Sequence, residues 1–241
     1  SKAYHLKSLR LAGFPIPPGF VLTTEVFRRR RAVDGLEMLK KEMHKMIREH
    51  LRVVENSTGK QYGDPKNPLL LSVRSGAAIS MPGAMDTFLN VGLNDEIAEA
   101  LSKKPNFAWT AWDSYRRLLQ SWGMAYGMDR DDYDEVISVF KDKYQVSQKV
   151  DFSPEAMREI AMTYKQLLAE NNIDFEEEPF AQLIASIDLV FASWSSDRAK
   201  AYRKHLEIAD EWGTAVIVQR MVFGNLGRTS GTGVVFTQNP K

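Results

Sequence analysis

The chain has 241 residues, of which 44% are hydrophobic and 26% are charged, and its formal net charge at pH 7 is +1. This composition is typical of a soluble globular protein and gives no basic excess that would favour nucleic acid as a partner. The absence of cysteine excludes disulfides and thiolate metal sites, and no apolar run has the length of a membrane span, so we expect a cytoplasmic protein without a membrane partner.

The first 54 residues predict helices on either side of a short strand. An amphipathic segment ends near Gly13 because three prolines follow it, and residues 20–22 are typical of a strand. Thr24 is a suitable N-cap for the next helix. Apolar residues at helical spacing continue to Val54, and we expect Gly35 to divide this stretch into two helices.

Residues 69–94 contain the most unusual chemistry of the chain. The apolar run 69–73 predicts a buried strand, and Arg74 follows it, beside a loop rich in serine and glycine. A buried guanidinium needs an anionic partner, and its planar fork suits phosphate oxygens. The pattern therefore suggests a phosphate site, with a structural ion pair between Arg74 and Asp86 as the alternative.

A predominantly helical block is predicted from 94 to about 171. Asn94 and Asp95 would cap its first helix, and aromatic and aliphatic stripes at 112–122 and 157–168 favour core packing over base stacking. Pro179 begins another helix, which is followed by arginines 198 and 203, expected to be exposed.

The last part of the chain has β-rich composition. Residues 214–223 predict a strand, a glycine-rich turn follows, and residues 234–237 predict a second strand. The pattern alone predicts a hairpin with a glycine-rich tip.

The exact strings add a resemblance to a known family. SVRSGAAISMPGAMDTFLNVGLND resembles the nucleotide-binding domain of the pyruvate phosphate dikinases, and so do NFAWTAWDSYRRLLQSWG, PFAQLIASIDLVFASWSSDRAKAYR, GTAVIVQRMVFGN and SGTGVVFTQNP, in the same order. The related phosphoenolpyruvate synthases have a similar Arg-Ser element but a different following loop. The resemblance covers essentially the whole chain.

The resemblance implies an α+β fold, with the first lobe of an ATP-grasp-like domain, a helical insertion and the opening β-hairpin of a second lobe. On this basis we expect residues 1–93 and 178–216 to form the first lobe and residues 94–177 the insertion. Residues 217–241 would be the hinge strand and the start of a truncated second lobe.

The resemblance also implies a set of ATP-binding residues. Arg74 would clamp phosphate oxygens as the catalytic residue, the loop with Gly83, Asp86 and Thr87 would contact the phosphates, and Lys2 would add charge. Gln219, Met221 and Val222 would border the adenine, and a lid with Gly231 and Gly233 would close above. The Mg²⁺ ligands are expected beyond Lys241.

The implied activity is that of a pyruvate phosphate dikinase, which converts ATP, pyruvate and phosphate to AMP, phosphoenolpyruvate and diphosphate. Phosphoryl groups would pass through a histidine on a swivelling domain outside this chain, so the chain alone is expected to be inactive, and the longer protein is expected to be a homo-oligomer. Two alternatives stay open: a phosphoenolpyruvate synthase or other dikinase-like phosphotransferase, and a nucleotide-binding module without catalysis.

Overall fold

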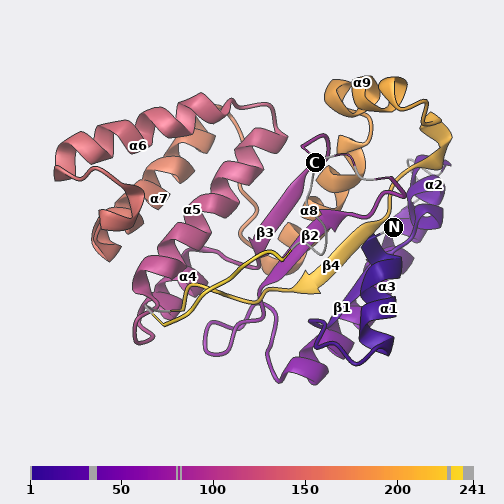
Figure 1. Cartoon of the computed structure of the whole chain (residues 1–241), viewed down its shortest axis with the longest axis horizontal. Helices are drawn as coiled ribbons and strands as arrows, with labels where there is room; N and C mark the ends of the chain where they lie inside the picture. Colours follow the sequence, from indigo (N-terminus) through magenta and orange to yellow (C-terminus); the bar gives the residue numbers. More distant parts are fainter. Residues whose placement is uncertain (1, 33–36, 80, 82, 227–228, 236–241) are drawn as a thin grey trace.

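An antiparallel β-sheet forms the centre of the molecule. The computed structural model describes residues 2–32, 37–79, 81, 83–226 and 229–235. In these residues four strands pair in the order β1 (Gly19–Leu22), β4 (Val216–Arg220), β2 (Leu71–Ser75) and β3 (Thr87–Val91). The strand from near the end of the chain thus lies between β1 and β2 (Figure 1).

Helices make up most of the remaining ordered structure, and two short 3₁₀ turns accompany them. The α-helices of the described residues are α1 (Lys2–Leu11), α2 (Thr24–Ala32), α3 (Glu37–Thr58), α4 (Asp95–Ser102), α5 (Ala108–Ala125), α6 (Arg130–Tyr144), α7 (Pro154–Glu170), α8 (Pro179–Ser193) and α9 (Asp197–His205). The 3₁₀ turns are η1 (Lys149–Asp151) and η2 (Asp210–Trp212). The expected α+β class is confirmed.

The two faces of the sheet differ in what covers them. Because side chains alternate along a strand, cross-strand partners such as Val73 and Val218 share one face, and both are fully buried. Helices α3, α5 and α8 pack against this face. The opposite face carries Arg74. Its other members include the exposed side chains of Thr87 and Leu89 and the buried side chains of Ser72, Ile217 and Gln219. Arg74 therefore lies on the face of the sheet opposite to helices α3, α5 and α8.

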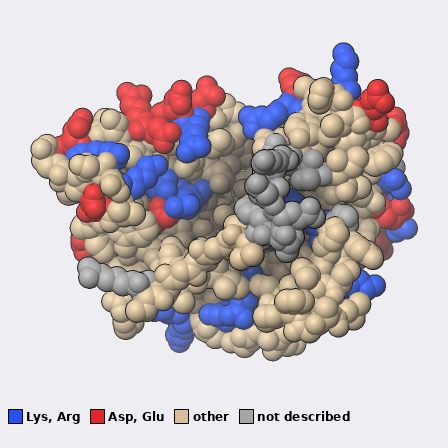
Figure 2. Space-filling view, viewed as in Figure 1, with Lys and Arg blue, Asp and Glu red and all other residues tan. Residues whose placement is uncertain are grey.

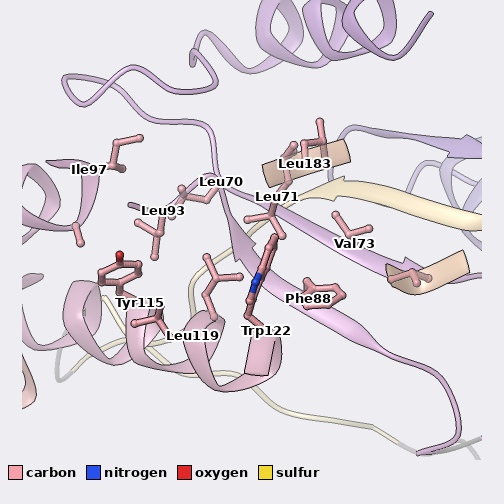
Figure 3. Close-up of a cluster of buried hydrophobic side chains, with 14 of the residues drawn as sticks. Leu70, Leu71, Val73, Phe88, Leu93, Ile97, Tyr115, Leu119, Trp122 and Leu183 are labelled. Atoms are coloured by element: carbon pink, nitrogen blue, oxygen red, sulfur yellow. The ribbon is translucent and has the colours of Figure 1, made fainter. Parts of the chain in front are cut away.

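Trp122 joins the helical block to the sheet. Its ring lies 6.0 Å from that of Phe88 on β3 and 5.2 Å from that of Phe175, measured between centroids. Figure 3 shows Trp122 between the sheet residues Leu71 and Phe88, with Leu119 and Tyr115 of the same helix continuing the cluster toward Leu93. The aromatic stripe of α5 is thus core, as its helical spacing predicted.

Several helix ends also follow the sequence signals. The side chain of Asn94 accepts a hydrogen bond from the Ile97 amide at 2.9 Å and caps α4. Ser153 caps α7 in the same way, and Pro154 occupies its first turn. Pro179 begins α8, and α2 and α3 lie on either side of residues 33–36, which contain Gly35. Helix α2 begins at Thr24 itself, so Thr24 is not the cap.

The Asn94 cap gives a first testable expectation. Besides accepting from Ile97, Asn94 donates through Nδ2 to the carbonyl of Glu177 at 3.1 Å. Asn94→Ala should lower the free energy of unfolding by about 1 kcal/mol, the usual cost of losing a side-chain cap. Chemical denaturation measures this. Asn56→Ala, at an exposed position inside α3, is the control, and an equal loss in both variants would contradict the capping role.

Three expectations about the second half of the chain are wrong. The last strand ends at Arg220 and does not continue to Phe223. Val234 and Val235 are exposed and lie outside any strand, so the described part of the chain lacks the second strand of the predicted hairpin; residues 236 and 237 lie outside it. Arg203 is buried rather than exposed, because its guanidinium pairs with Asp210 at 2.6 Å.

No helix in the described ranges combines the length and apolarity needed to cross a membrane.

Candidate functional site

Arg74 is the most unusual cation of the sheet. It is the fourth residue of β2, one residue before the strand ends, and its side chain is half-buried. Its Nη2 donates to Oε1 of Gln219 at 2.5 Å, whereas its buried Nε has no hydrogen-bond partner among the described residues. Burial lowers the pKa of Arg74, although an arginine still remains charged near neutrality. The guanidinium is therefore a desolvated charge with hydrogen-bonding capacity left for an anion.

Gln219 is the residue that holds Arg74 in place. It lies on β4, its side chain is buried, and the two side chains share the less covered face of the sheet. While Oε1 accepts from Arg74, Nε2 donates to the carbonyl of Pro17 at 2.9 Å. Its cross-strand partner on β1 is Gly19. A Cβ at Gly19 would lie only 2.4 Å from the carbonyl oxygen of Val218. The close approach of β1 to β4 therefore requires glycine at this position.

The loop that follows β2 is attached to α8 and α9 rather than to Arg74. The amide of Asp86 donates to Oγ of Ser193 at 3.2 Å, and the carbonyl of Gly83 accepts from Nη1 of Arg198 at 2.9 Å. Burial raises the pKa of Asp86, and the charge of Arg198 opposes this shift. The ion pairs among the described residues do not include Asp86 and Arg74, so the predicted ion pair between these two residues is wrong. Residues 80 and 82 of this loop lie outside the described residues.

Thr87 is brought to the same place as Arg74. It opens β3, pairs in register with Arg74, and is exposed. Gly83 has a positive φ of 70°, and a Cβ there would have no neighbour within 4 Å. The loop therefore leaves open space above the edge of the sheet, where a ligand could approach the backbone.

The segment after β4 leaves the sheet and runs along the helical block. The amide of Met221 donates to the carbonyl of Leu70 at 2.9 Å, whereas the next side chain, of Val222, is 67% exposed. The ring of Phe223 then packs edge-on against Phe107 at 5.4 Å. In Figure 1 the segment passes from β4 toward α4 and back in front of the sheet. This packing explains why a β-rich sequence does not extend the strand.

The remaining predicted residues are not gathered around Arg74 in this structure. Gly231 and Gly233 are exposed and lie outside helices and strands, and a Cβ on Gly224 would lie 1.9 Å from Thr232, so the chain turns back on itself there. Lys2 is exposed in the first turn of α1, and none of the described contacts connects it to Arg74.

Two cavities lie elsewhere in the described part of the molecule. One of about 610 Å³ is lined by acidic side chains, among them Asp95, Glu99 and Glu155, which would repel an anion. The other, of about 310 Å³, lies beside Arg48, Tyr62 and Phe180. Neither is lined by Arg74 or Gln219. In the described ranges no group of three or more His, Cys, Asp or Glu residues could hold a metal ion.

Sequence reasoning named Gln219 but missed its contact with Arg74, and it missed the attachment of the loop to Ser193 and Arg198. The partner of Arg74 is 145 residues away along the chain, and Ser193 and Arg198 are more than a hundred residues from the loop that they hold. No local signal identifies such pairs, because they depend on strand register and helix placement. The β-rich composition of residues 214–223 did place Gln219 on a strand, but it gave no sign that this strand lies beside Arg74.

The link between Gln219 and Arg74 can be tested through stability. Gln219→Leu keeps the volume but removes the acceptor of a half-buried guanidinium, so we expect the free energy of unfolding to fall by about 1–3 kcal/mol. Chemical denaturation measures the change, with the exposed Gln166→Leu on α7 as the matched control. An unchanged stability for Gln219→Leu would mean that water replaces the amide without cost.

Comparison with known proteins gives a consistent result. Residues 36–241 match the family model described as pyruvate phosphate dikinase, AMP/ATP-binding domain. The chain is 40% identical over 242 residues to the pyruvate, phosphate dikinase of Clostridium symbiosum, covering 99% of this chain and 28% of that protein. It is 39% identical over 243 residues to the Giardia intestinalis protein of the same name, covering 100% of this chain and 27% of that protein. The chloroplastic protein of Mesembryanthemum crystallinum is 41% identical over 241 residues, covering 99% and 25%. The chain thus spans about a quarter of the length of these relatives.

Proposed function

Because the chain belongs to the AMP/ATP-binding domain family of the pyruvate phosphate dikinases, we propose that it binds ATP on the sheet face that carries Arg74. The observation that supports this most is the guanidinium of Arg74, which is held by Gln219 and keeps a buried, unpartnered Nε among the described residues. A phosphate oxygen accepts from the terminal N–H groups of this guanidinium and neutralises its charge. Phosphoryl transfer depends on such positioning and neutralisation.

The other residues of the proposed site surround this anchor. Gly83, Asp86 and Thr87 belong to the loop that contacts the phosphates, and the attachment of this loop to Ser193 and Arg198 fixes its position. Gln219 borders the adenine together with the backbone at Met221 and Val222. Gly231 and Gly233 belong to a lid that closes over the phosphates, and Lys2 adds positive charge.

The proposed fold is the first lobe of an ATP-grasp domain. Residues 1–93 and 178–216 form the lobe, residues 94–177 the helical insertion, and residues 217–241 the hinge strand and the start of the second lobe. The position of Arg74 on the sheet face opposite helices α3, α5 and α8 supports this assignment, because a nucleotide bound there needs a second wall to be enclosed. We propose that the carboxylate ligands of Mg²⁺ lie beyond Lys241.

The longer protein is proposed to be a cytoplasmic, homo-oligomeric pyruvate phosphate dikinase. It would form phosphoenolpyruvate, AMP and diphosphate from pyruvate, ATP and phosphate through a phosphohistidine on a swivelling domain, and the 241-residue chain alone would be inactive. The names of the relatives support this reaction over that of a phosphoenolpyruvate synthase or of a module without catalysis.

An assay of the longer protein distinguishes these functions. With ATP and pyruvate, a dikinase needs added inorganic phosphate and releases diphosphate. A synthase forms phosphoenolpyruvate without added phosphate, and a binding module forms none. We expect strict dependence on phosphate, and product formation in its absence would contradict the dikinase assignment.

A further inference from the structure

The backbone hydrogen bonds at the end of β4 bring Arg220 near Lys60, outside the proposed ATP site. Arg220 is the last residue of β4, and its amide donates to the carbonyl of Pro18 at 2.9 Å. The next amide donates to the carbonyl of Leu70, and the amide of Leu69 donates to the carbonyl of Gln61 at 2.8 Å. These bonds tie the end of β4 to the loop after α3, which begins with Lys60.

A third cation comes from the loop after α4. Lys104 lies between α4 and α5, and the helix that follows contacts the segment after Arg220: Oγ1 of Thr110 donates to the carbonyl of Asn225 at 2.8 Å. We call Lys60, Lys104 and Arg220 the basic cluster. Figure 2 shows Lys and Arg side chains along the lower edge of the molecule, on the side of α4 and the end of β4.

The charges of the basic cluster are not compensated by the described part of the protein. The pKa of Lys60 is lowered first by burial and then by the positive charges of Lys104 and Arg220. None of the ion pairs among the described residues includes a member of the cluster, whereas the neighbouring Lys103 pairs with Glu99 at 3.5 Å. Like charges held together without a counter-ion destabilise the fold, so their arrangement calls for an anion.

The donors of the cluster are partly fixed in place. The Nε of Arg220 is buried and has no hydrogen-bond partner in the described ranges. Nζ of Lys60 donates to Oδ1 of Asn67 at 3.4 Å, while Nδ2 of the same asparagine donates to the carbonyl of Gly59 at 2.6 Å. Asn67 therefore positions Lys60 and leaves its other N–H groups available.

The basic cluster is distinct from the site of Arg74. Arg220 pairs across the sheet with Leu71, and Arg74 pairs with Ile217. Because side chains alternate along β2, these two pairs lie on opposite faces of the sheet. One small ligand bound at Arg74 would not reach Arg220 through the packed sheet.

We infer that the basic cluster is a second anion site, which binds the phosphate group of a small ligand on the side of the sheet away from Arg74. A phosphate accepts hydrogen bonds from the ammonium groups of Lys60 and Lys104 and from the terminal N–H groups of Arg220, and its charge offsets the repulsion within the cluster. Free phosphate and the phosphates of a nucleotide share this chemistry. The inference does not depend on the proposed function.

Calorimetric titration of the 241-residue chain tests this inference, with inorganic phosphate and with ATP at constant ionic strength. Both ligands are titrated into Arg74→Ala, which removes the anchor on the other face, and into the same protein with Lys60→Gln and Arg220→Gln. We expect saturable phosphate binding to Arg74→Ala that becomes at least about tenfold weaker in the triple variant, as for the loss of charged hydrogen-bond donors. If ATP but not inorganic phosphate bound saturably, and its affinity fell equally in the triple variant, a nucleotide would be identified as the ligand.

Two controls separate the site from general charge and from folding. Lys103→Gln removes an adjacent, ion-paired lysine and should change the affinity by less than about twofold. In the absence of phosphate, Lys60→Gln with Arg220→Gln should melt at or above the temperature of the unmodified chain, because repulsion is relieved. The inference would be overturned if neither ligand bound saturably, or if Lys103→Gln lowered the affinity as much as Lys60→Gln with Arg220→Gln does. A melting temperature of Lys60→Gln with Arg220→Gln below that of the unmodified chain would also overturn it.

Discussion

Arg74→Ala in the longer protein should abolish most ATP-dependent phosphorylation of the histidine and leave phosphoenolpyruvate-dependent phosphorylation intact. The substitution removes a charged hydrogen-bond donor that faces the proposed phosphates, which costs about 1.5–3 kcal/mol, or roughly ten- to hundredfold in the interaction. The ATP-dependent phosphorylation by Arg74→Lys should lie between that of the unmodified protein and that of Arg74→Ala, because lysine keeps the charge but lacks the planar fork. Radiolabel transfer from each donor measures the two half-reactions separately.

A control substitution distinguishes the clamp from a structural role. Arg29 is exposed and pairs with Glu25 on the same helix at 3.1 Å, so Arg29→Ala should affect neither half-reaction. Equal loss of both half-reactions in Arg74→Ala, or a large fall in its melting temperature, would show that Arg74 supports the fold and does not bind nucleotide.

Trp122→Ala should be the most destabilising single substitution that we consider. The side chain is 1% exposed, packs against Phe88 and Phe175, and donates through Nε1 to the carbonyl of Asp174 at 3.0 Å. Truncation leaves a large cavity between α5 and the sheet, so we expect the free energy of unfolding to fall by roughly 3–5 kcal/mol. Chemical denaturation at equilibrium measures the loss.

Two comparisons make the result for Trp122 specific. Trp122→Phe keeps part of the ring contact but leaves the carbonyl of Asp174 without its donor, and it should cost less than the alanine variant. Trp212 is 48% exposed, and its replacement by alanine should change stability by about 0.5 kcal/mol or less. Similar losses for Trp122→Ala and Trp212→Ala would contradict the role of Trp122 as the link between the layers.

Local patterns predicted the elements well because their causes are local. The cap at Asn94, the proline at the start of α8 and the apolar stripe of α5 each reflect contacts within one or two turns of helix. The buried strand that carries Arg74 was also identified, because a short apolar run has few alternatives.

Long-range features could not be derived in this way. The position of β4 between β1 and β2 decides that Gln219 meets Arg74, and no local signal fixes that register. The strand ends early because Phe223 packs on Phe107, which overrides the β-propensity of the segment. The burial of Arg203 likewise depends on Asp210, which the chain brings back from a separate turn.

We propose that ATP binds to the 241-residue chain through Arg74 and that the magnesium ligands lie beyond Lys241. Calorimetric titration of ATP into the chain and into its Arg74→Ala variant, each with and without Mg²⁺, tests both parts. Because the first lobe alone would cover the nucleotide on one side only, we expect weak binding to the unmodified chain that Mg²⁺ does not strengthen and that Arg74→Ala weakens further. Tight, Mg²⁺-dependent binding would contradict the placement of the magnesium ligands beyond Lys241. Binding that is unchanged in Arg74→Ala would contradict the role of Arg74 in binding ATP.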